Sequence, residues 1–498
     1  MAGKLNLIPP SGNIIKGQPF LVAVSITDET GITDTTKIDV VLPQGVTLIK
    51  KFPGSVARGV FNQQMVFQAD ESATDHEIIF TADSTSKPTN KATYHPVDNP
   101  VLKPETCVLR GASAYLYDSN PAKPGADITG HPYVSASINP MTRLNKPISS
   151  YDIPLRTTAP LRIIPEGQNE VQPYQVEGEN QYYYYLINKP SETAVNLKIY
   201  ATEGLSQFVA IETIFSEIEY NQKETIFVNT DTINTSSSFE PPTIEETYSS
   251  STLTRQDQTD NFHFMIPNYP GAKPGNFIIG FVSDDQTNFY KKQLCIGQLK
   301  HEHNGYYKIP ADYGNLYDGD NFISYVGLDQ YGNTIGSKPN YISYDSGGNN
   351  SPDPDDKNRT LVAPELYDQF KRFIGIYQSV NIYSIGQKGL EVRLPIDPTQ
   401  QNQDTIVLGD MIMIKAYISY CIDTTSPPRP LPIIVANSKT VKKSDVDRGY
   451  FKATIKPEQL LGYDSSDDND GTISIDYLRV ASGQKSKLFI RSIGTVAP

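Results

Sequence analysis

The feature that most constrains this chain is an alternation of apolar and polar residues with a period of two. Every second residue from Phe20 to Ile26 is large and apolar, and the pattern recurs from Val195 to Ile199 and from Ile473 to Tyr477. Because successive side chains of a β-strand point to opposite faces, this period predicts strands that bury one face. Helical spacing is rare: Pro364–Tyr377 is one short helix or the irregular start of a strand, and Pro457–Leu461 is a possible helical turn.

Short strands separated by turn residues make up most of the chain. The 31 Tyr and 19 Phe favour strands, whereas the 37 Pro and 34 Gly fall mostly between apolar runs. A parallel α/β fold needs long amphipathic helices between its strands, and the sequence lacks them. We therefore predict an all-β protein built from antiparallel β-sandwiches or barrels.

The length of 498 residues exceeds what one core supports, so three or four domains are expected. Two polar, breaker-rich segments, Asn229–Asp260 and Asp345–Thr360, mark boundaries, and the second has the composition of a linker. A short interruption of the apolar pattern near Asp98–Pro104, flanked by prolines, marks a third boundary. Residues Thr142–Glu179 lack clean strands, which makes the second unit an elaborated sandwich. The four predicted domains are residues 1–103, 104–250, 251–350 and 359–498.

A four-residue phrase occurs twice. Ala122–Gly125 recurs as Ala272–Gly275, and each copy precedes an apolar run; Gly17 and Gly409 precede similar runs. Proline restricts φ and glycine permits a tight turn, so each phrase is predicted to lead into a core strand of its sandwich.

A second duplication links the two C-terminal domains. Residues Asn304–Lys308 (Asn-Gly-Tyr-Tyr-Lys) resemble Arg448–Lys452 (Arg-Gly-Tyr-Phe-Lys). The later copy lies farther from its preceding glycine, which a loop insertion at Asp423–Pro432 explains.

The net charge of −13 argues against a nucleic-acid partner, because proteins that bind nucleic acid carry a basic stripe. The pair Lys442-Lys443 is too short for such a stripe and is interpreted as a solvated turn.

The three cysteines, Cys107, Cys295 and Cys421, fall about one to a domain. No domain can close its own disulfide, so buried reduced thiols are expected. A bridge between domains or subunits is the alternative.

No window approaches the ~18 consecutive apolar residues of a membrane span, and the first residues do not form a secretory signal. The protein therefore stays in the cell, leaves it by a route without a cleaved signal peptide, or is a mature fragment. Of these, we predict a location outside the cell or at its surface, reached without a cleaved signal peptide. A cytoplasmic location is the alternative.

Two segments have metal-like composition. His301 and His303 could share one face of a strand and one ion, although Asn304-Gly305 beside them favours a hairpin tip. Oxygen ligands for calcium cluster in the second segment, at Asp464, Asp467, Asp468 and Asp470. That spacing does not follow the EF-hand template, so a solvated turn is the alternative. Calcium is the one cofactor that these residues suggest.

The run Tyr182, Tyr183, Tyr184 and Tyr185 places two rings on each face of an expected strand. One pair can enter the core. The other pair either stacks on a sugar or on a protein ligand, or packs against a neighbouring domain.

No catalytic motif is recognisable. The chain contains no nucleophile elbow, phosphate-binding loop, dinucleotide fingerprint or zinc-protease motif. The 56 acidic residues leave a two-carboxylate glycosidase open without pointing to one. We expect a protein that is not an enzyme and assign no catalytic residue.

Several turn-and-strand phrases resemble those of bacterial immunoglobulin-like repeats. They are Lys16–Pro19 with the strand Phe20–Ile26, Asp329–Asn333 after a strand, and the two duplicated Gly-Tyr segments. Such repeats occur in adhesins of the invasin and intimin type and in other surface or fibre proteins. The resemblance implies tandem immunoglobulin-like sandwiches and carries over no functional residue.

These observations predict a non-enzymatic structural or adhesive protein, a rod of sandwich domains that mediates attachment or self-assembly. Its partners would be a protein surface, a glycan surface or copies of itself. The alternatives are an array of carbohydrate-binding modules and a component of a secreted toxin or effector.

Overall fold

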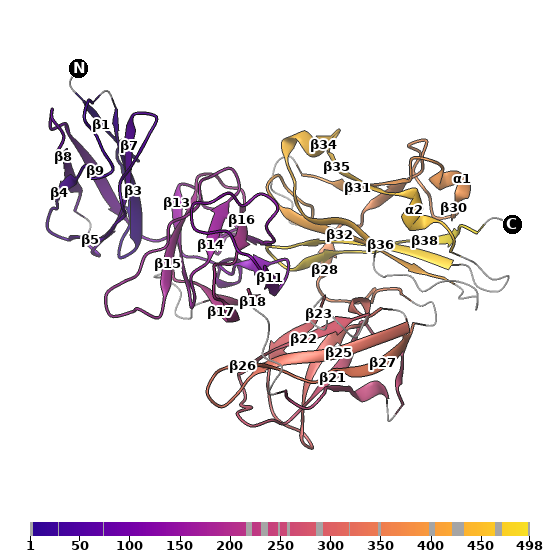
Figure 1. Cartoon of the computed structure of the whole chain (residues 1–498). Helices are drawn as coiled ribbons and strands as arrows, with labels where there is room; N and C mark the ends of the chain where they lie inside the picture. Colours follow the sequence, from indigo (N-terminus) through magenta and orange to yellow (C-terminus); the bar gives the residue numbers. More distant parts are fainter. Residues whose placement is uncertain are drawn as a thin grey trace.

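The computed structural model describes residues 3–27, 29–72, 74–215, 222–230, 238–247, 250–255, 259–284, 292–317, 319–346, 350–397, 404–420, 433–463 and 471–496. Within this part of the chain, eight β-sheets form four sandwiches, each built from one continuous stretch of sequence (Figure 1). The all-β prediction is confirmed. The four sandwiches are called domains 1 to 4 below.

Domain 1 pairs the sheet β1-β3-β7-β5, with β6 on β7, against the sheet β2-β9-β8-β4. Its core lies between the sheets and includes Phe61, Phe67 and Phe80, which are fully buried. The strands are β1 (Lys4–Ile8), β2 (Gly12–Ile15), β3 (Pro19–Thr27), β4 (Ile38–Val41), β5 (Val46–Lys51), β6 (Ser55–Ala57), β7 (Val60–Ala69), β8 (His76–Ala82) and β9 (Thr89–Val97).

Domain 2 pairs the sheet β10-β12-β16-β14 against β11-β18-β17-β13-β15. A 3-10 turn, η1 (Pro104–Thr106), precedes it. The strands are β10 (Arg110–Gly111), β11 (Tyr115–Tyr117), β12 (Val134–Ile138), β13 (Tyr151–Thr157), β14 (Arg162–Pro165), β15 (Tyr183–Lys189), β16 (Val195–Tyr200), β17 (Ser206–Thr213) and β18 (Gln222–Asn229).

Domain 3 pairs the sheet β19-β21-β24 against β20-β27-β25-β22-β23, with β26 on β25. The 3-10 turns are η2 (Glu245–Thr247) and η3 (Tyr313–Asn315). The strands are β19 (Thr243–Ile244), β20 (Thr252–Thr254), β21 (Asn261–Pro267), β22 (Phe277–Ser283), β23 (Lys292–Gln298), β24 (Tyr306–Asp312), β25 (Gly319–Leu328), β26 (Thr334–Gly336) and β27 (Asn340–Asp345).

The predicted boundary near residue 250 falls inside domain 3. Ile244 of β19 is buried in the core of this domain, and the Phe239 backbone pairs with that of Ser337. The polar composition that suggested a boundary belongs in part to a two-residue edge strand, β19, which pairs with β21.

Domain 4 pairs the sheet β29-β31-β35-β34 against a sheet of seven strands that includes β28-β37-β36-β32-β33 and β38 with β30. It also holds the short helices α1 (Ile382–Ile385) and α2 (Pro457–Leu460) and the 3-10 turn η4 (Lys443–Asp445). The strands are β28 (Arg359–Leu361), β29 (Glu365–Tyr367), β30 (Val380–Asn381), β31 (Leu390–Pro395), β32 (Met411–Ser419), β33 (Ile433–Thr440), β34 (Val446–Asp447), β35 (Tyr450–Ile455), β36 (Gly471–Arg479), β37 (Gln484–Ser486) and β38 (Phe489–Gly494).

One topological device recurs in all four domains. An early strand pairs in parallel with the last strand, as β2 with β9, β11 with β18, β20 with β27, and β30 with β38. In domain 1 the sheet orders correspond to strands A-B-E-D facing a sheet that contains G-F-C, which is the immunoglobulin arrangement. The chain is therefore a tandem array of immunoglobulin-like sandwiches.

The prediction that each copy of the Ala-Lys-Pro-Gly motif leads into a core strand is confirmed for the second copy and wrong for the first, because the two copies occupy different places in their domains. Gly125 lies in the connection from β11 to β12, as Gly17 lies between β2 and β3, whereas Gly275 and Gly409 lie just before β22 and β32. All four glycines have positive φ, between 67° and 92°. The same four-residue motif therefore forms two different turns, and in both of them glycine adopts the left-handed conformation.

The second duplication is structurally real. The pairs Asn304-Gly305 and Arg448-Gly449 both have positive φ at the two residues, as does Arg58-Gly59 in domain 1. Two consecutive positive φ values are typical of a type I′ turn, which joins two strands in a tight hairpin. Each pair leads into the equivalent strand, β7, β24 or β35. The proposed insertion at 423–432 lies outside the described residues.

The two helical candidates have different outcomes. Pro457–Leu460 is helical, as α2. Pro364–Tyr377 holds only the three-residue strand β29 followed by turns, because residues 368–374 fold back on β29 through the backbone bond from the Ile374 N–H to the Leu366 carbonyl.

Domains 1 and 2 meet through a small apolar cluster. Phe52 and Val66 from domain 1 pack with Tyr174, Tyr184 and Leu186 from domain 2. A polar seam closes one side of this contact, where the Tyr151 hydroxyl donates to Gln18 Oε1 at 3.1 Å.

Domains 2 and 3 meet in the same way. Phe227 of β18 is buried with Ile279 and Phe281 of β22, and the ring of Tyr115 meets that of Phe281 edge-on at 5.0 Å. Phe208 stacks on Phe277 at 5.7 Å.

The described part of the predicted linker is pinned between domains 3 and 4. The Asn350 side chain donates to the Ile418 carbonyl at 3.0 Å, and the Asp353 N–H donates to Asp260 Oδ1. Because both neighbouring domains take hydrogen bonds from it, this segment fixes an angle between them rather than acting as a free tether.

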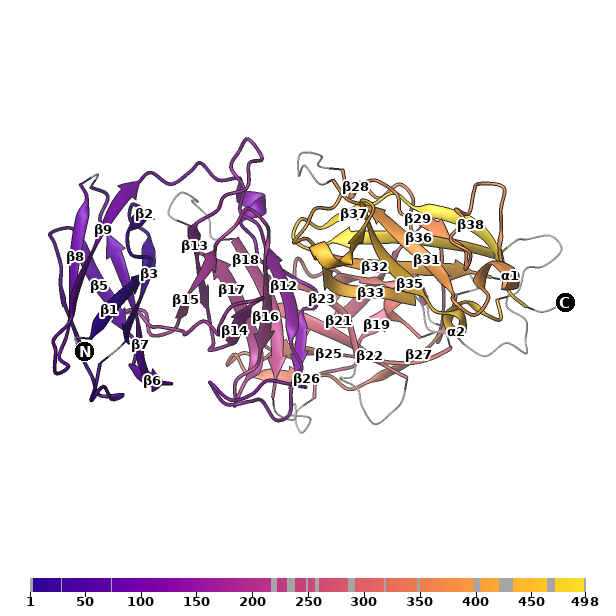
Figure 2. The same cartoon turned by 90° about the horizontal axis from the view of Figure 1, so that it is seen from above.

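Domains 2 and 4 also touch, although Asn196 and Gly409, which meet there, are 213 residues apart in the chain. Asn196 Nδ2 donates to the Gly409 carbonyl at 3.0 Å, and Lys442 Nζ forms a 2.7 Å ion pair with Glu166. Lys442 is therefore more than a solvated turn residue. Domain 3 lies to one side of the line that runs from domain 1 through domain 2 to domain 4 (Figures 1 and 2). The linear rod expected from the sequence is replaced by a bent arrangement in which domains 2, 3 and 4 contact one another.

The ion pair between domains 2 and 4 should weaken in acid. Burial raises the pKa of Glu166, but the hydrogen bond and charge of Lys442 outweigh it, so the pKa lies below its ordinary value of 4.5. A carboxyl whose folded pKa is depressed stabilises the contact above the unfolded pKa and loses that effect as pH falls through the folded value. At pH 7, Glu166→Gln should therefore mimic acid, with a cost of about 0–1 kcal/mol because both partners are partly exposed.

Hydrogen exchange of the amides around residues 440–445 measures this effect, which should appear as faster exchange in Glu166→Gln. The control Glu77→Gln removes an exposed ion pair with Lys91 in domain 1 and should leave these amides unchanged. Identical exchange in all three proteins would contradict the prediction.

Candidate functional site

The histidine pair lies at a hairpin tip, which was the alternative raised from the sequence. The His303 N–H and Tyr306 carbonyl, and the reverse pair, close the turn at Asn304-Gly305. His301 and His303 are both exposed. Glu302 between them accepts from the Asn268 side chain and the Gly305 N–H. A metal ion at this pair stays a prediction.

Another group in domain 3 has the ligand types of a metal site. Nδ1 of His263 lies 2.8 Å from Glu246 Oε1 and 3.3 Å from Glu245 Oε2. Lys308 Nζ already contacts Glu245, and the hydrogen bond to Lys308 lowers the pKa of the Glu245 carboxyl. The arrangement is that of an ion-pair cluster at the sheet edge. The sequence did not predict it, because its members are brought together by the pairing of β21 with β19 and β24.

Residues Asp464, Asp467, Asp468 and Asp470, the predicted calcium ligands, lie outside the described residues. Cys421 does too. Cys107 and Cys295 are buried and free, and burial raises the pKa of each thiol to about 12, which keeps both protonated.

The four tyrosines divide between two contacts. Tyr185 is fully buried in the core of domain 2, and Tyr183 packs against the same core. Tyr184 and Tyr182 face the other way, into the apolar cluster shared with domain 1, where Tyr184 stacks on Tyr174 at 5.6 Å. The second face of this strand thus packs against a neighbouring domain. A ligand-binding role for these rings stays a prediction.

Exposed large apolar residues gather instead at one end of domain 4, here called the apolar end. Within the described residues, this segment between β29 and β31 exposes more large apolar side chains than other segments of similar length. Its members are Phe370, Phe373, Ile376, Tyr377, Ile382 and Tyr383.

The apolar end is held rigidly by polar contacts beneath it. Gln369 donates to the backbone carbonyls of Ser384 and Tyr383, which ties the first loop to α1. The carboxylate of Asp368, itself buried, accepts from the backbone N–H groups of Phe370 and Arg372 at 2.9 Å. The rings of Phe370 and Tyr383 lie 5.4 Å apart. The surface is therefore ordered before any partner arrives.

Ile376 and Tyr377 are the most exposed residues of this surface. They are the two central residues of a β-turn closed by the Gln378 N–H and the Gly375 carbonyl, and Tyr377 is 95 % exposed. The Arg491 side chain donates to the Ile374 carbonyl just before this turn and anchors it to β38.

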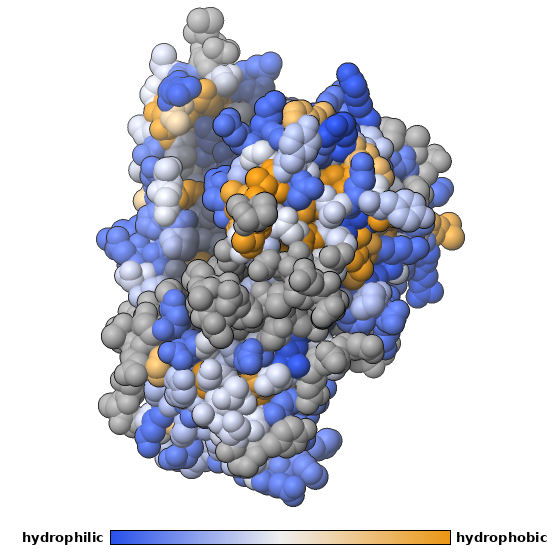
Figure 3. All heavy atoms as spheres, turned by 90° about the vertical axis from the view of Figure 1, so that its right-hand side faces the viewer, coloured by the Kyte–Doolittle hydropathy of each residue, from blue (hydrophilic) through white to orange (hydrophobic). Residues whose placement is uncertain are grey.

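Two basic side chains in the first loop of the apolar end are paired with carboxylates. Arg372 and Asp368 form a salt bridge of 2.8 Å, and Lys371 pairs with Glu391. Aromatic rings and arginine around an apolar centre are enriched in protein interfaces. Figure 3 shows hydrophobic atoms grouped over the upper part of this face, where domain 4 lies, and sparse over domain 3 below.

The sequence pattern of this surface predicts a different local structure. The spacing of Leu366, Phe370, Phe373 and Ile374 fits one face of a helix, and a helix would have turned these residues inward together. The loop buries Leu366 and Ile374 and leaves the two phenylalanines outside.

Known proteins resemble this chain only distantly. No protein-family model matches the sequence. No curated protein matches it either. Among solved structures, a tetra-tandem repeat from the extending region of a large adhesion protein is 9 % identical, covers 99 % of this chain and 100 % of its own, and has a TM-score of 0.15.

Two further solved structures are similar to the same degree. Domains 4–9 of the surface layer protein SbsC are 10 % identical, with 99 % of this chain and 65 % of that chain covered and a TM-score of 0.21. The adhesin InvE of Yersinia pseudotuberculosis is 9 % identical, with 54 % and 68 % covered and a TM-score of 0.17. With TM-scores this low, the matches do not bear on the function of this chain. Within the described residues, no helix has the length and hydropathy needed to cross a bilayer.

Proposed function

We propose that this chain is a non-enzymatic structural protein that assembles with copies of itself through the apolar end of domain 4. The observation that carries the proposal is the exposed, ordered group of aromatic and aliphatic side chains at residues 370–383. In Figure 1 this segment, marked by α1 and β30, lies at the end of the molecule opposite domain 1. The immunoglobulin-like array would serve as the scaffold of such an assembly at a cell surface.

Contacts inside the chain support a sandwich domain as the partner. Domain 1 meets domain 2 through Phe52, Tyr174 and Tyr184, and domain 2 meets domain 3 through Phe227 and Phe281. The apolar end has the same chemistry, aromatic rings with aliphatic neighbours.

A second copy is the simplest partner because an apolar surface is complementary to itself. Two copies that meet at this end form an isologous, closed dimer. Burying one large apolar side chain contributes about 1.5–3 kcal/mol. Several buried together offset the roughly 4–15 kcal/mol that association costs.

Sedimentation velocity of the full chain tests the proposal. The wild type should pass from monomer to dimer between about 1 and about 100 μM. The double variant Ile376→Ser/Tyr377→Ser should remain monomeric over this range, because losing two buried side chains weakens the dimer by about 3 kcal/mol or more. The matched control is Tyr331→Ser in domain 3, which removes a tyrosine of similar exposure, 80 %, from a single hairpin tip and should dimerise like the wild type.

A wild type that stays monomeric at every concentration would overturn the proposal, as would a dimer that the double variant leaves intact. If the monomer instead floats with phosphatidylcholine vesicles, and the double variant does not, the apolar end is a lipid-binding surface and the proposal fails. Circular dichroism should show the same folded content in all variants, since the replaced side chains are exposed.

A further inference from the structure

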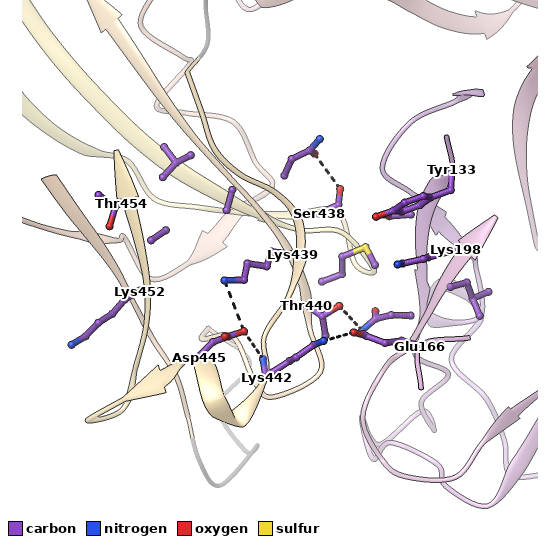
Figure 4. Close-up of a pocket in the computed structure, with 18 residues that line it drawn as sticks. Tyr133, Glu166, Lys198, Ser438, Lys439, Thr440, Lys442, Asp445, Lys452 and Thr454 are labelled. Atoms are coloured by element: carbon purple, nitrogen blue, oxygen red, sulfur yellow. Dashed lines mark hydrogen bonds and ion pairs between the residues drawn. The ribbon is translucent and has the colours of Figure 1, made fainter. Parts of the chain in front are cut away.

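A cleft of about 680 Å³ lies between domains 2 and 4, a volume within the range of small-ligand sites (Figure 4). Domain 2 contributes β12, β16 and Glu166, and domain 4 contributes β33, β35 and the turn that contains η4. Nothing in the proposed self-assembly uses these residues.

The cleft is basic in an acidic protein. Its lining includes four lysines and two carboxylates, whereas the whole chain has a net charge of −13. The lysines are Lys198 from domain 2 and Lys439, Lys442 and Lys452 from domain 4. Carboxylates compensate three of them: Lys442 pairs with Glu166, Lys452 with Asp447, and Lys439 approaches Asp445 at 4.0 Å.

Lys198 differs from the other three lysines. Among the described residues, no carboxylate is within ion-pair distance of it, and its ammonium group lies 4.8 Å from the centre of the Tyr133 ring instead. A cation over an aromatic face is attracted by the ring, but an anion from outside would be a stronger partner. The cleft therefore offers one positive charge that the described part of the protein does not neutralise by an ion pair.

Tyr133 supplies a flat apolar surface next to this charge. The Tyr133 side chain is 44 % exposed, and its ring lies 5.3 Å from the ring of the buried Tyr200. The exposed part of this ring, beside the Lys198 ammonium, offers an apolar surface to the flat face of a planar or ring-shaped ligand. In Figure 4, Tyr133 and Lys198 lie side by side on the domain 2 wall, facing Ser438 and Thr440.

The opposite wall presents hydroxyl and amide groups on a distorted edge strand. Strand β33 has irregular register with β32, and Ser438 has a φ of +46°, which is strained for a residue with a side chain. Asn437 beside it is exposed. A bulge of this kind re-aims side chains and blocks the pairing of a further strand, so this wall is suited to side-chain recognition rather than to strand addition.

The two walls are fixed relative to each other. Asn196, which is buried, donates to the Gly409 carbonyl and to Thr440 Oγ1, and Lys442 bridges to Glu166. A site assembled before binding loses less entropy when it is occupied.

We propose that this cleft binds an acidic oligosaccharide. The sugar ring would stack on Tyr133, its carboxylate or sulfate would pair with Lys198, and its hydroxyls would bond to Asn437, Ser438 and Thr440. An aromatic platform next to a cation and a row of hydroxyl and amide groups suits this ligand better than a peptide strand, which the bulge in β33 disfavours.

Isothermal titration of the full chain at low salt tests the proposal. The probes are trigalacturonate, a heparin-derived tetrasaccharide, neutral maltotriose and hexaglutamate. Trigalacturonate or the heparin fragment should bind, and whichever binds more tightly distinguishes a carboxylate ligand from a sulfated one. Maltotriose should bind at least roughly tenfold more weakly than the better acidic sugar, because it lacks the group that pairs with Lys198. Raising the salt should weaken binding of the acidic sugar.

Lys198→Gln and Tyr133→Ala should each weaken binding of the acidic sugar by roughly tenfold or more, as expected when a central contact is removed. The control Lys388→Gln removes an exposed lysine of domain 4 that does not line the cleft, and should bind like the wild type. Absence of binding to both acidic sugars overturns the proposal. So does equal binding by all variants, or tighter binding of hexaglutamate than of either sugar.

Discussion

Replacing Asp476 with alanine should destabilise domain 4 by about 3–5 kcal/mol, because it leaves the guanidinium of Arg359 buried without its partner. Arg359 Nη1 donates to Asp476 Oδ2 at 2.8 Å, and the two side chains are 3 % and 7 % exposed. The same guanidinium donates to the carbonyls of Asp353 and Ser486, so it joins the segment entering the domain to β36 and β37. Without the Asp476 carboxylate, the entering segment and the strands β36 and β37 would be held together less tightly.

Hydrogen exchange of the β36 amides is the appropriate measurement, since a chain of four domains does not unfold in one step. The double variant Arg359→Met/Asp476→Leu removes both charges and should recover most of the loss. Glu458→Ala breaks an exposed pair with Lys456 in the same domain and should cost less than about 1 kcal/mol. An Asp476→Ala protein that exchanges like Glu458→Ala would show that Arg359 is not stabilised by this pair.

The sequence predicted the strands well because their signal is local. The alternation at Phe20–Ile26 became β3, the one at Val195–Ile199 lies in β16, and the one at Ile473–Tyr477 lies in β36. Alternation specifies which face is buried without any knowledge of the neighbouring strand. The duplicated Gly-Tyr segments were recognisable for the same reason, since a type I′ turn places its demand on two adjacent residues.

The candidate sites were beyond the reach of the sequence because they depend on how the domains meet. Lys198 and Thr440 line the same cleft although they are far apart in the chain, and Lys198 has no basic neighbour in the sequence that would draw attention to it. Tyr184 was recognised as an unusual residue, but its environment is set by Phe52 and Val66 of another domain. The apolar end could not be predicted for a different reason. The apolar residues at 366–374 have helical spacing, but this segment is a short strand followed by a loop, which buries two of the four residues and exposes the other two.

The bend in the array also depends on contacts between domains, which the sequence does not show. A segment rich in Ser, Gly, Asp and Pro is expected to be a free tether. Its described part, however, contains Asn350 and Arg359, which are buried between or within domains 3 and 4. Composition indicates where strands end, whereas the hydrogen bonds made by two or three residues decide whether a connection is rigid.

Gly389→Ala should destabilise domain 4 by about 2–5 kcal/mol, because it adds backbone strain in the left-handed region to a steric clash. Gly389 joins α1 to the core strand β31 with a φ of +73°. A Cβ at this position would lie 2.0 Å from the backbone carbonyl oxygen of Ile455, a contact that a side-chain movement cannot relieve. Relief requires β31 to move away from β35, its partner in the sheet.

The matched control is Gly483→Ala in the same domain. Gly483 has a nearly equal φ of +70°, and a Cβ there meets nothing within 4 Å, so only the backbone strain of about 1–2 kcal/mol should remain. Thermal unfolding of domain 4 by calorimetry compares the two, and equal shifts would contradict the clash. Because Gly389 follows the helix that carries Ile382 and Tyr383, Gly389→Ala should also weaken the dimer, whereas Gly483→Ala should not. Measuring self-association below the unfolding temperature therefore tests whether the apolar end must be held in place by β31 in order to bind.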